Sequence, residues 1–129
     1  MAGGLAELGL GANDKIVLYL PNGVEVAQLL YAALTLGAVA VPVTTRMSVR
    51  ELTDFCEDCE AKVLAFHYDQ AAGLGDLRAA RPGMASVAVG GEVSGAVPFA
   101  SLLQERPGDL PTVPSDQDEC MINYTSGTT

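Results

Sequence analysis

The residues with the clearest chemical potential are the last five of the chain, Thr125, Ser126, Gly127, Thr128 and Thr129. Four of them carry a hydroxyl beside a backbone N–H, and Gly127 allows a positive-φ turn and a close approach to a ligand. Consecutive small residues in such a turn can surround phosphate oxygens as an anion-binding nest. The run contains no lysine and does not match the Walker pattern. On its own it favours an ordinary turn over a phosphate site.

Two cysteines with C-x-x-C spacing, Cys56 and Cys59, form a second candidate, because this spacing occurs in redox and zinc sites. We favour a structural role for the pair. The chain holds no second such pair, His67 is its only histidine, and both cysteines fall inside a helical pattern rather than at a helix start. His67 follows an expected strand, and a surface position is the better interpretation than a catalytic one.

Acidic and aromatic residues elsewhere receive no catalytic assignment either. The acidic run of Asp116, Asp118 and Glu119 is interpreted as a solvated segment and not as a metal site. Tyr31 and Tyr124 are expected in the core rather than at a ligand. The sequence therefore predicts no catalytic residue and no metal site, and it leaves the terminal run as the binding candidate.

Composition and charge narrow the class of protein. The 129 residues are 49% hydrophobic and 18% charged, which is typical of one globular domain. Seven basic residues stand against 16 acidic ones, and the basic residues do not cluster, so a nucleic-acid partner is not expected. Three cysteines and an N-terminus unlike a signal peptide favour the cytoplasm. The uncharged stretch Val26–Thr45 is as long as a membrane span, but Gly37 interrupts it, so a buried helix followed by a strand is preferred.

Strands and helices that alternate along the chain would position these residues. Continuous apolar runs predict strands at Lys15–Leu20, Val39–Val43, Lys62–Phe66, Ala85–Val89 and Cys120–Tyr124. Helical spacing predicts helices at Ala2–Leu8, from Asn22 to about Leu36, at Val49–Cys59 and at Phe99–Gln104, with a broken helix between His67 and Arg81. Gly90–Pro98 is expected to be a loop and Arg106–Asp118 a linker. The alternation predicts an α/β fold with a mainly parallel sheet and flanking helices.

Capping signals mark two helix starts. Asn22 and Glu25 form a box-like arrangement, and Ser48 and Glu51 form a cleaner capping box. Pro42 cannot donate to a ladder, so its strand is expected to end there or to lie at an edge of the sheet. Two apolar helix faces are expected, one of Val24, Ala27, Leu30, Tyr31 and Leu34, the other of Leu52, Phe55, Cys56 and Cys59.

The terminal run Tyr124–Thr129 (YTSGTT) resembles the opening of the signature Y-T-S-G-[ST]-T-G-x-P-K-G of the adenylate-forming superfamily, which holds acyl-CoA synthetases, peptide-synthetase adenylation domains and luciferases. Residues 8–43 are similar to the family's G-D-x-V-x-x-x-x-P-N strand, its following helix and its G-A-V-x-V-P-x strand. Residues 48–64 resemble its next helix and strand, [ST]-x-x-E-L-x-x-x-L-x-D-[AS]-x-A-K-x-[LV]. The resemblance spans nearly the whole chain, and the pieces occur in the family's order.

This resemblance implies a two-step ligase. A carboxylate attacks the α-phosphate of Mg-ATP to give an acyl-adenylate and pyrophosphate, and a thiol, commonly that of coenzyme A, then displaces AMP. It also implies that Thr125, Ser126, Gly127, Thr128 and Thr129 hold the β- and γ-phosphates. A small-molecule carboxylate, ATP and CoA are the expected partners, with ATP and Mg²⁺ as the expected cofactors. The TRMSVREL stretch lacks the Y-P-x-E-R-L form of peptide-synthetase domains, which favours an acyl-CoA synthetase.

The departures from the family pattern are as informative as the matches. Thr44–Thr45 stands where the family has N-P, and Cys59 stands at a small core-facing Ser or Ala position. The chain also stops before the signature's Gly, Pro and Lys and lacks the later nucleotide and magnesium contacts. We therefore expect residues 1–129 to be part of an N-terminal AMP-binding domain, truncated at both ends and inactive alone. The alternative is a non-catalytic α/β interaction module derived from such an enzyme. An exposed sheet edge and unpartnered apolar helices would also favour self-association of the fragment.

Overall fold

A five-stranded parallel sheet forms the centre of the computed structural model, which describes residues 1–103 and 114–125. The strand order is β2-β1-β3-β4-β5, and every paired neighbour is parallel. The strands are β1 (Lys15–Tyr19), β2 (Val39–Val43), β3 (Val63–His67), β4 (Ala85–Val89) and β5 (Val97–Pro98). The predicted α/β fold with a mainly parallel sheet is confirmed, and the first four strands lie within one residue of their predicted bounds.

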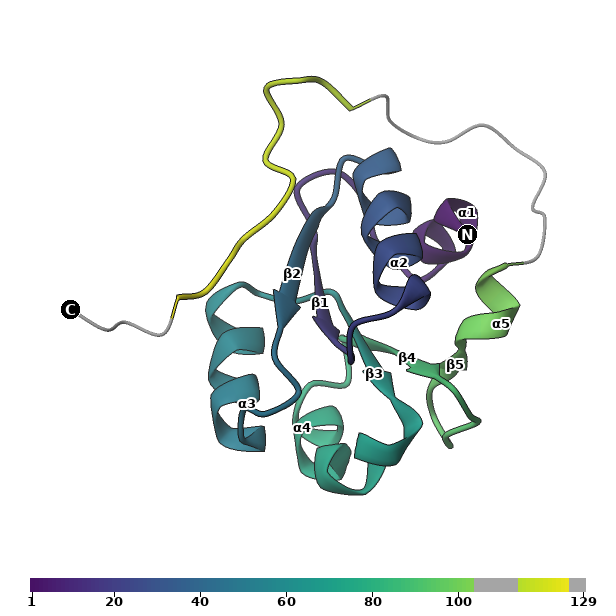
Figure 1. Cartoon of the computed structure of the whole chain (residues 1–129), viewed down its shortest axis with the longest axis vertical. Coiled ribbons are helices and arrows are strands. Elements are labelled where there is room, and N and C mark those ends of the chain that lie inside the picture. The colour runs from purple at the N-terminus through teal and green to yellow at the C-terminus, as the bar shows by residue number, and fades with distance from the viewer. Residues whose placement is uncertain (104–113, 126–129) are drawn as a thin grey trace.

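Helices cover both faces of this sheet (Figure 1). They are α1 (Ala2–Glu7), α2 (Val24–Thr35), α3 (Val49–Asp58), the 3₁₀ helix η1 (Tyr68–Leu74), α4 (Gly75–Ala80) and α5 (Phe99–Leu102). Figure 1 shows α1, α2 and α5 on one side of the sheet and α3 and α4 on the other. Successive residues of a strand point to opposite faces, so Ile16 and Leu18 pack with the first group while Val17 and Tyr19 pack with the second. Burial on both faces explains the continuous apolar runs of the sequence.

Helix α2 corrects two predictions. Asn22 does not cap the helix: Gly23 holds the N-cap position with no side-chain hydrogen bond, because an extended backbone at Gly23 leaves Asn22 one residue outside the helix. The buried residues of the helix are Leu29, Ala32 and Ala33, whereas Val24 and Tyr31 are each 68% exposed. The helix carries a single charged residue, Glu25, and is apolar nearly all round. The spacing of its apolar residues therefore does not indicate which face is buried.

Three smaller differences concern the second half of the chain. The region between His67 and Arg81 is a 3₁₀ helix followed by α4, and the change occurs at Gly75. The expected loop Gly90–Pro98 contains the two-residue strand β5. Helix α5 ends at Leu102, and residue 104 of the predicted helix lies outside the described residues, as does most of the expected linker. Within the described ranges, no helix is long and apolar enough to span a membrane.

Candidate functional site

The carboxyl ends of the parallel strands lie at one edge of the sheet, where α/β proteins commonly bind ligands. Strand β1 leads into α2 on one face, and its neighbour β2 leads into α3 on the other. Adjacent strands whose connections leave toward opposite faces open a crevice between their carboxyl ends. The candidate site lies along this edge, on the side of β1 and β2.

A tight turn follows β2 and is held by a side chain from β1. The backbone N–H of Met47 donates to the carbonyl of Thr44 at 3.3 Å, and the N–H of Arg46 donates to Thr44 Oγ1 at 3.2 Å. The buried Tyr19 places its hydroxyl 3.2 Å from the carbonyl oxygens of both Thr45 and Met47. The Thr44–Thr45 pair therefore forms an ordered turn where the resemblance led us to expect N-P.

Helix α3 starts directly after this turn, and the predicted capping box is confirmed. The N–H of Glu51 donates to Ser48 Oγ, and Glu51 Oε2 accepts from the backbone N–H of Ser48 at 2.8 Å. The hydrogen bond from the Ser48 backbone, aided by the Ser48 hydroxyl, lowers the pKa of the Glu51 carboxyl. The carboxylate of Glu51 is thus used in the cap, and the cap fixes where α3 begins relative to the turn.

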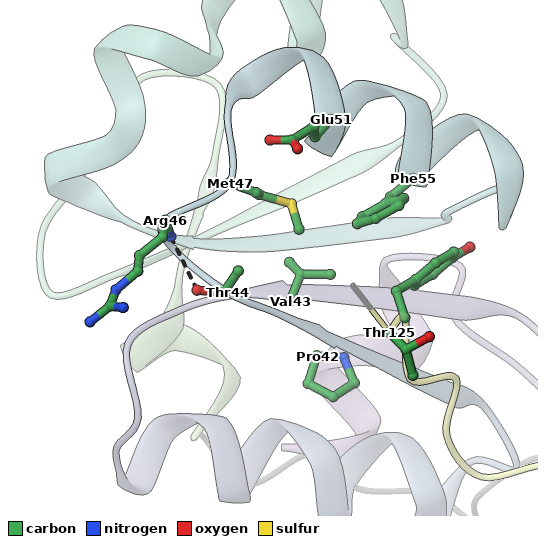
Figure 2. Close-up of a pocket in the computed structure, with 9 residues that line it drawn as sticks. Pro42, Val43, Thr44, Arg46, Met47, Glu51, Phe55 and Thr125 are labelled. Atoms are coloured by element: carbon green, nitrogen blue, oxygen red, sulfur yellow. Dashed lines mark hydrogen bonds between the residues drawn. The ribbon is translucent and has the colours of Figure 1, made fainter. Parts of the chain in front are cut away.

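A groove with a volume of about 440 Å³ lies between the turn, the first half of α3 and the C-terminal segment. Its walls are formed by Pro42, Val43, Thr44, Arg46, Met47, Glu51, Phe55, Tyr124 and Thr125. Figure 2 shows Met47 and Phe55 facing the same space as Thr125, while the Arg46 guanidinium extends away from both. A second groove of about 610 Å³ shares the turn residues and adds the polar side chains of Asn22 and Asn123.

The C-terminal segment, residues 114–125, reaches this site along the outer edge of β2 (yellow in Figure 1). The N–H of Ala40 donates to the Cys120 carbonyl at 3.0 Å, and the N–H of Ile122 donates to the Ala40 carbonyl at 2.9 Å. The predicted strand Cys120–Tyr124 is wrong, because only the single bridge between Ala40 and Met121 forms. Pro42 lies two residues beyond Ala40 and faces the same edge, and it has no N–H to continue the ladder.

Of the five residues predicted to bind phosphate, the structure places Thr125, which is exposed at the wall of the groove. Ser126, Gly127, Thr128 and Thr129 lie outside the described residues. Arg46 is the one cation among the described residues that line either groove, and sequence reasoning missed it. An exposed arginine in a turn carries no signal of its own. Thr125 and Arg46 therefore line one groove at the edge where parallel sheets bind ligands, with the Arg46 guanidinium directed away from Thr125.

The remaining candidates from the sequence are the C-x-x-C pair and the acidic run. Cys56 and Cys59 are buried and unbonded to each other, and burial raises the pKa of both thiols, that of Cys56 to about 12. No group of three potential metal-ligating side chains gathers within the described residues. The acidic run near residue 116 is exposed, as predicted.

Two single residues complete the outcome. His67 ends β3 with a partly exposed side chain that accepts from the Asp69 N–H at 3.4 Å. The expectation for Tyr31 is wrong, since its side chain is exposed, whereas Tyr124 is half-buried against the core.

The whole chain, residues 1–129, matches the sequence pattern of one family, described as AMP-binding enzyme. Long-chain-fatty-acid–CoA ligase FadD13 of Mycobacterium tuberculosis is 35% identical over 126 residues, which is 97% of this chain and 24% of that protein. The 2,3-dihydroxybenzoate-AMP ligase of Bacillus subtilis is 28% identical over the full chain, which again corresponds to 24% of that protein. The chain thus spans about a quarter of the length of these relatives.

Solved structures give the same result for the fold. A fatty acyl CoA synthetase of Mycobacterium tuberculosis superposes with a TM-score of 0.78 at 32% identity, over 98% of this chain and 25% of that one. The anthranilate CoA ligase AuaEII, solved with anthranoyl-AMP, superposes with a TM-score of 0.84 at 26% identity, over 99% of this chain and 25% of that one. The sheet and its flanking helices are therefore an arrangement shared with adenylate-forming enzymes.

Proposed function

Because the chain belongs to the AMP-binding enzyme family, we propose that it forms the N-terminal part of an ATP-dependent ligase that activates a carboxylate as an acyl-adenylate and then transfers the acyl group to a thiol, that of coenzyme A. The observation that carries the proposal is the position of Thr125. This first hydroxyl of the terminal run lies at the groove wall, beside the carboxyl ends of β1 and β2 and in one groove with Arg46.

The chemistry of the groove suits the phosphates of ATP. Hydroxyls and backbone N–H groups of the run Thr125–Thr129 would hold the β- and γ-phosphates as an anion nest. The Arg46 guanidinium is always charged and presents planar donors that match phosphate oxygens, so it would supply the cation that the run lacks. A cation is needed because the net charge of the chain is −9, which repels an anionic nucleotide at long range.

In this proposal the described residues contribute phosphate contacts, through Thr125 and Arg46, and we assign none of them a catalytic role. No group of three potential metal-ligating side chains gathers among them, and in this proposal Mg²⁺ binds together with the nucleotide. Magnesium supplies charge neutralisation on the phosphates during attack by the carboxylate. We propose that residues 1–129 alone do not catalyse adenylation, and that their share of the reaction is to orient the phosphates.

The test is Mg-ATP binding to residues 1–129, measured by NMR titration, together with carboxylate-dependent ATP–pyrophosphate exchange. We expect weak saturable binding that Arg46→Gln reduces several-fold, and no exchange. Arg50→Gln is the matched control, because Arg50 is an exposed arginine of α3 that lines neither groove. If both variants weakened Mg-ATP binding equally, Arg46 would act only through its general positive charge and not through a specific contact.

Absence of saturable binding to the wild-type chain would contradict the proposed phosphate role of the terminal run. Measurable exchange by residues 1–129 would contradict the proposal that they are inactive alone. The coding sequence after Thr129 gives an independent check, because a ligase of this family should continue as Gly-x-Pro-Lys-Gly.

A further inference from the structure

Tyr124 stands immediately before the proposed phosphate-binding run and is held by two side chains of α3 far away in the sequence. Its hydroxyl donates to Asp58 Oδ2 at 2.7 Å across 66 positions of the chain. Its ring stacks on Phe55, with ring centroids 4.1 Å apart and an interplanar angle of 20°. We call these three residues, Phe55, Asp58 and Tyr124, the tyrosine cluster.

We propose that Phe55 and Asp58 are positioning residues, which fix Tyr124 and thereby set where Thr125 meets the phosphates. This inference rests on the proposed function and extends it to two residues of α3 that no hydroxyl or glycine pattern marks. Phe55 also lines the groove itself, so the same stacking contact forms part of the wall next to Thr125 (Figure 2).

The backbone alone does not fix the end of the described chain. Residues 120–125 make one bridge to β2, through Ala40, and Pro42 prevents the ladder from continuing toward Thr125. Beyond Ile122, the contacts of Tyr124 with α3 are the described interactions that hold the segment at the groove. Without them, the backbone bridge at Met121, four positions before Thr125, would be the nearest hydrogen-bonded attachment of this residue to the sheet.

Helix α3 is suited to this task because its own position is fixed, both at its start and along its buried face. The Ser48–Glu51 box sets its start, and Leu52 and Cys56, fully buried, pin it to the sheet. Phe55 and Asp58 are three positions apart on a helix, so they project from one face and contact the ring and the hydroxyl of one tyrosine together. A hydrogen bond to a carboxylate is also stronger than one between neutral groups.

The chain offers an unusual pair of probes for this inference. It contains two isoleucines, Ile16 in the sheet core and Ile122 in the C-terminal segment. Labelling the isoleucine δ1 methyl groups therefore gives one NMR signal for each region. Loss of the tyrosine cluster should move the Ile122 signal toward that of an unstructured chain and leave the Ile16 signal in place.

The experiment measures Mg-ATP and pyrophosphate affinity of residues 1–129 in the wild type and in Asp58→Ala, Asp58→Asn and Asp54→Ala. Asp54 is an exposed aspartate one turn earlier on α3, and Asp54→Ala makes the same change in charge. Removing a negative charge should by itself favour an anion, so Asp54→Ala should leave affinity unchanged or raise it. We expect Asp58→Ala to lower affinity about three- to tenfold, the value of one hydrogen bond.

Rescue and non-additivity separate positioning from a merely structural role. Asp58→Asn keeps an acceptor for the Tyr124 hydroxyl and should restore part of the affinity. Tyr124→Phe should weaken ligand binding as Asp58→Ala does. The double variant should bind no more weakly than either single variant, because each substitution removes the same hydrogen bond. Phe55→Leu should release the Ile122 signal through loss of the ring stack.

Each outcome decides between the two proposals. If the wild-type chain binds neither ligand, the proposed function fails and the positioning role fails with it. If the wild type binds and Asp58→Ala binds equally well, or if Asp54→Ala weakens binding as much, only the positioning role is overturned. Lower affinity in Asp58→Ala, with an unchanged Ile16 signal, supports both.

Discussion

The sheet region and the C-terminal segment are held in place by different means. In residues 1–103, four strands are buried on both faces and paired along most of their lengths, so burial and hydrogen bonds reinforce each other. Residues 114–125 have one bridge, one ring stack and one side-chain hydrogen bond to the rest of the chain, and Ile122 and Tyr124 pack partly buried against the core. A region secured by so few contacts can detach without unfolding the sheet, and the proposed ligand contact lies in that region.

The largest effect on stability is expected from a cavity in the core on the α3 side of the sheet. Phe66 is fully buried in β3, and Phe66→Ala should lower the free energy of unfolding by about 3–5 kcal/mol. Both isoleucine signals should then be lost together, because the C-terminal segment has nothing to dock on. Urea unfolding followed by circular dichroism measures the change. Tyr31→Ala, on the exposed face of α2, should stay within about 0.5 kcal/mol of the wild type.

A change at the start of α3 should affect stability less and leave the docking intact. Ser48→Ala removes the capping acceptor and should cost about 1 kcal/mol in the free energy of unfolding. Ser48→Asp, which retains an acceptor, should restore most of it. The Ile122 signal should remain native in the folded protein, since Phe55 and Asp58 lie in the later turns of the helix. A released Ile122 signal in Ser48→Ala would show that docking depends on the whole helix.

Alkaline pH should separate the two regions without any substitution. The hydrogen bond to Asp58 raises the pKa of Tyr124 to about 12, against about 10 for a free tyrosine. A raised pKa means that the bond contributes fully below about pH 10 and is lost as the pH rises through 12. Titration of ¹³Cζ-labelled tyrosine should show this late ionisation. It should disappear in Tyr124→Phe and move to lower pH in Asp58→Ala.

The reactivity of the three thiols should distinguish the C-terminal segment from the sheet region in the unsubstituted protein. Cys120 is exposed in the segment, while Cys56 in α3 and Cys59 at its C-terminal end are buried, and their raised pKa values keep them as thiols. Alkylation at pH 8 should modify Cys120 rapidly and the other two only in denaturant. Mass spectrometry of the digested protein distinguishes the three sites. Rapid modification of Cys56 in the folded chain would contradict the buried arrangement.

The parts of the fold that the sequence predicted are those that local pattern decides. Strands buried on both faces leave continuous apolar runs, so β2 and β4 have the predicted bounds. The start of α3 follows from Ser48 and Glu51, which are three positions apart and need no tertiary contact to form a box. Burial of α2 was not predictable in this way, because its apolar residues surround the helix and only packing against the sheet decides between faces.

The candidate site was predictable only where it carries a motif. Thr125 belongs to a run whose residue types indicate phosphate chemistry, whereas Arg46 is placed by the hydroxyl of Tyr19, 27 positions earlier in the chain, which holds the carbonyls on either side of it. The strand expected at Cys120–Tyr124 failed for a similar reason. The residue that stops it, Pro42, belongs to a distant strand and becomes its neighbour only in the folded chain.

Pro42 also bears on how copies of this protein could aggregate. An open sheet normally offers the donors and acceptors of its outermost strand to another chain, which can add to it and begin a fibril. Within β2 the outward donor of Ala40 is already taken by Cys120, and Pro42 has none to offer. The opposite edge is the two-residue β5, which contains Pro98. Growth by strand addition is thus discouraged at both borders of the described sheet.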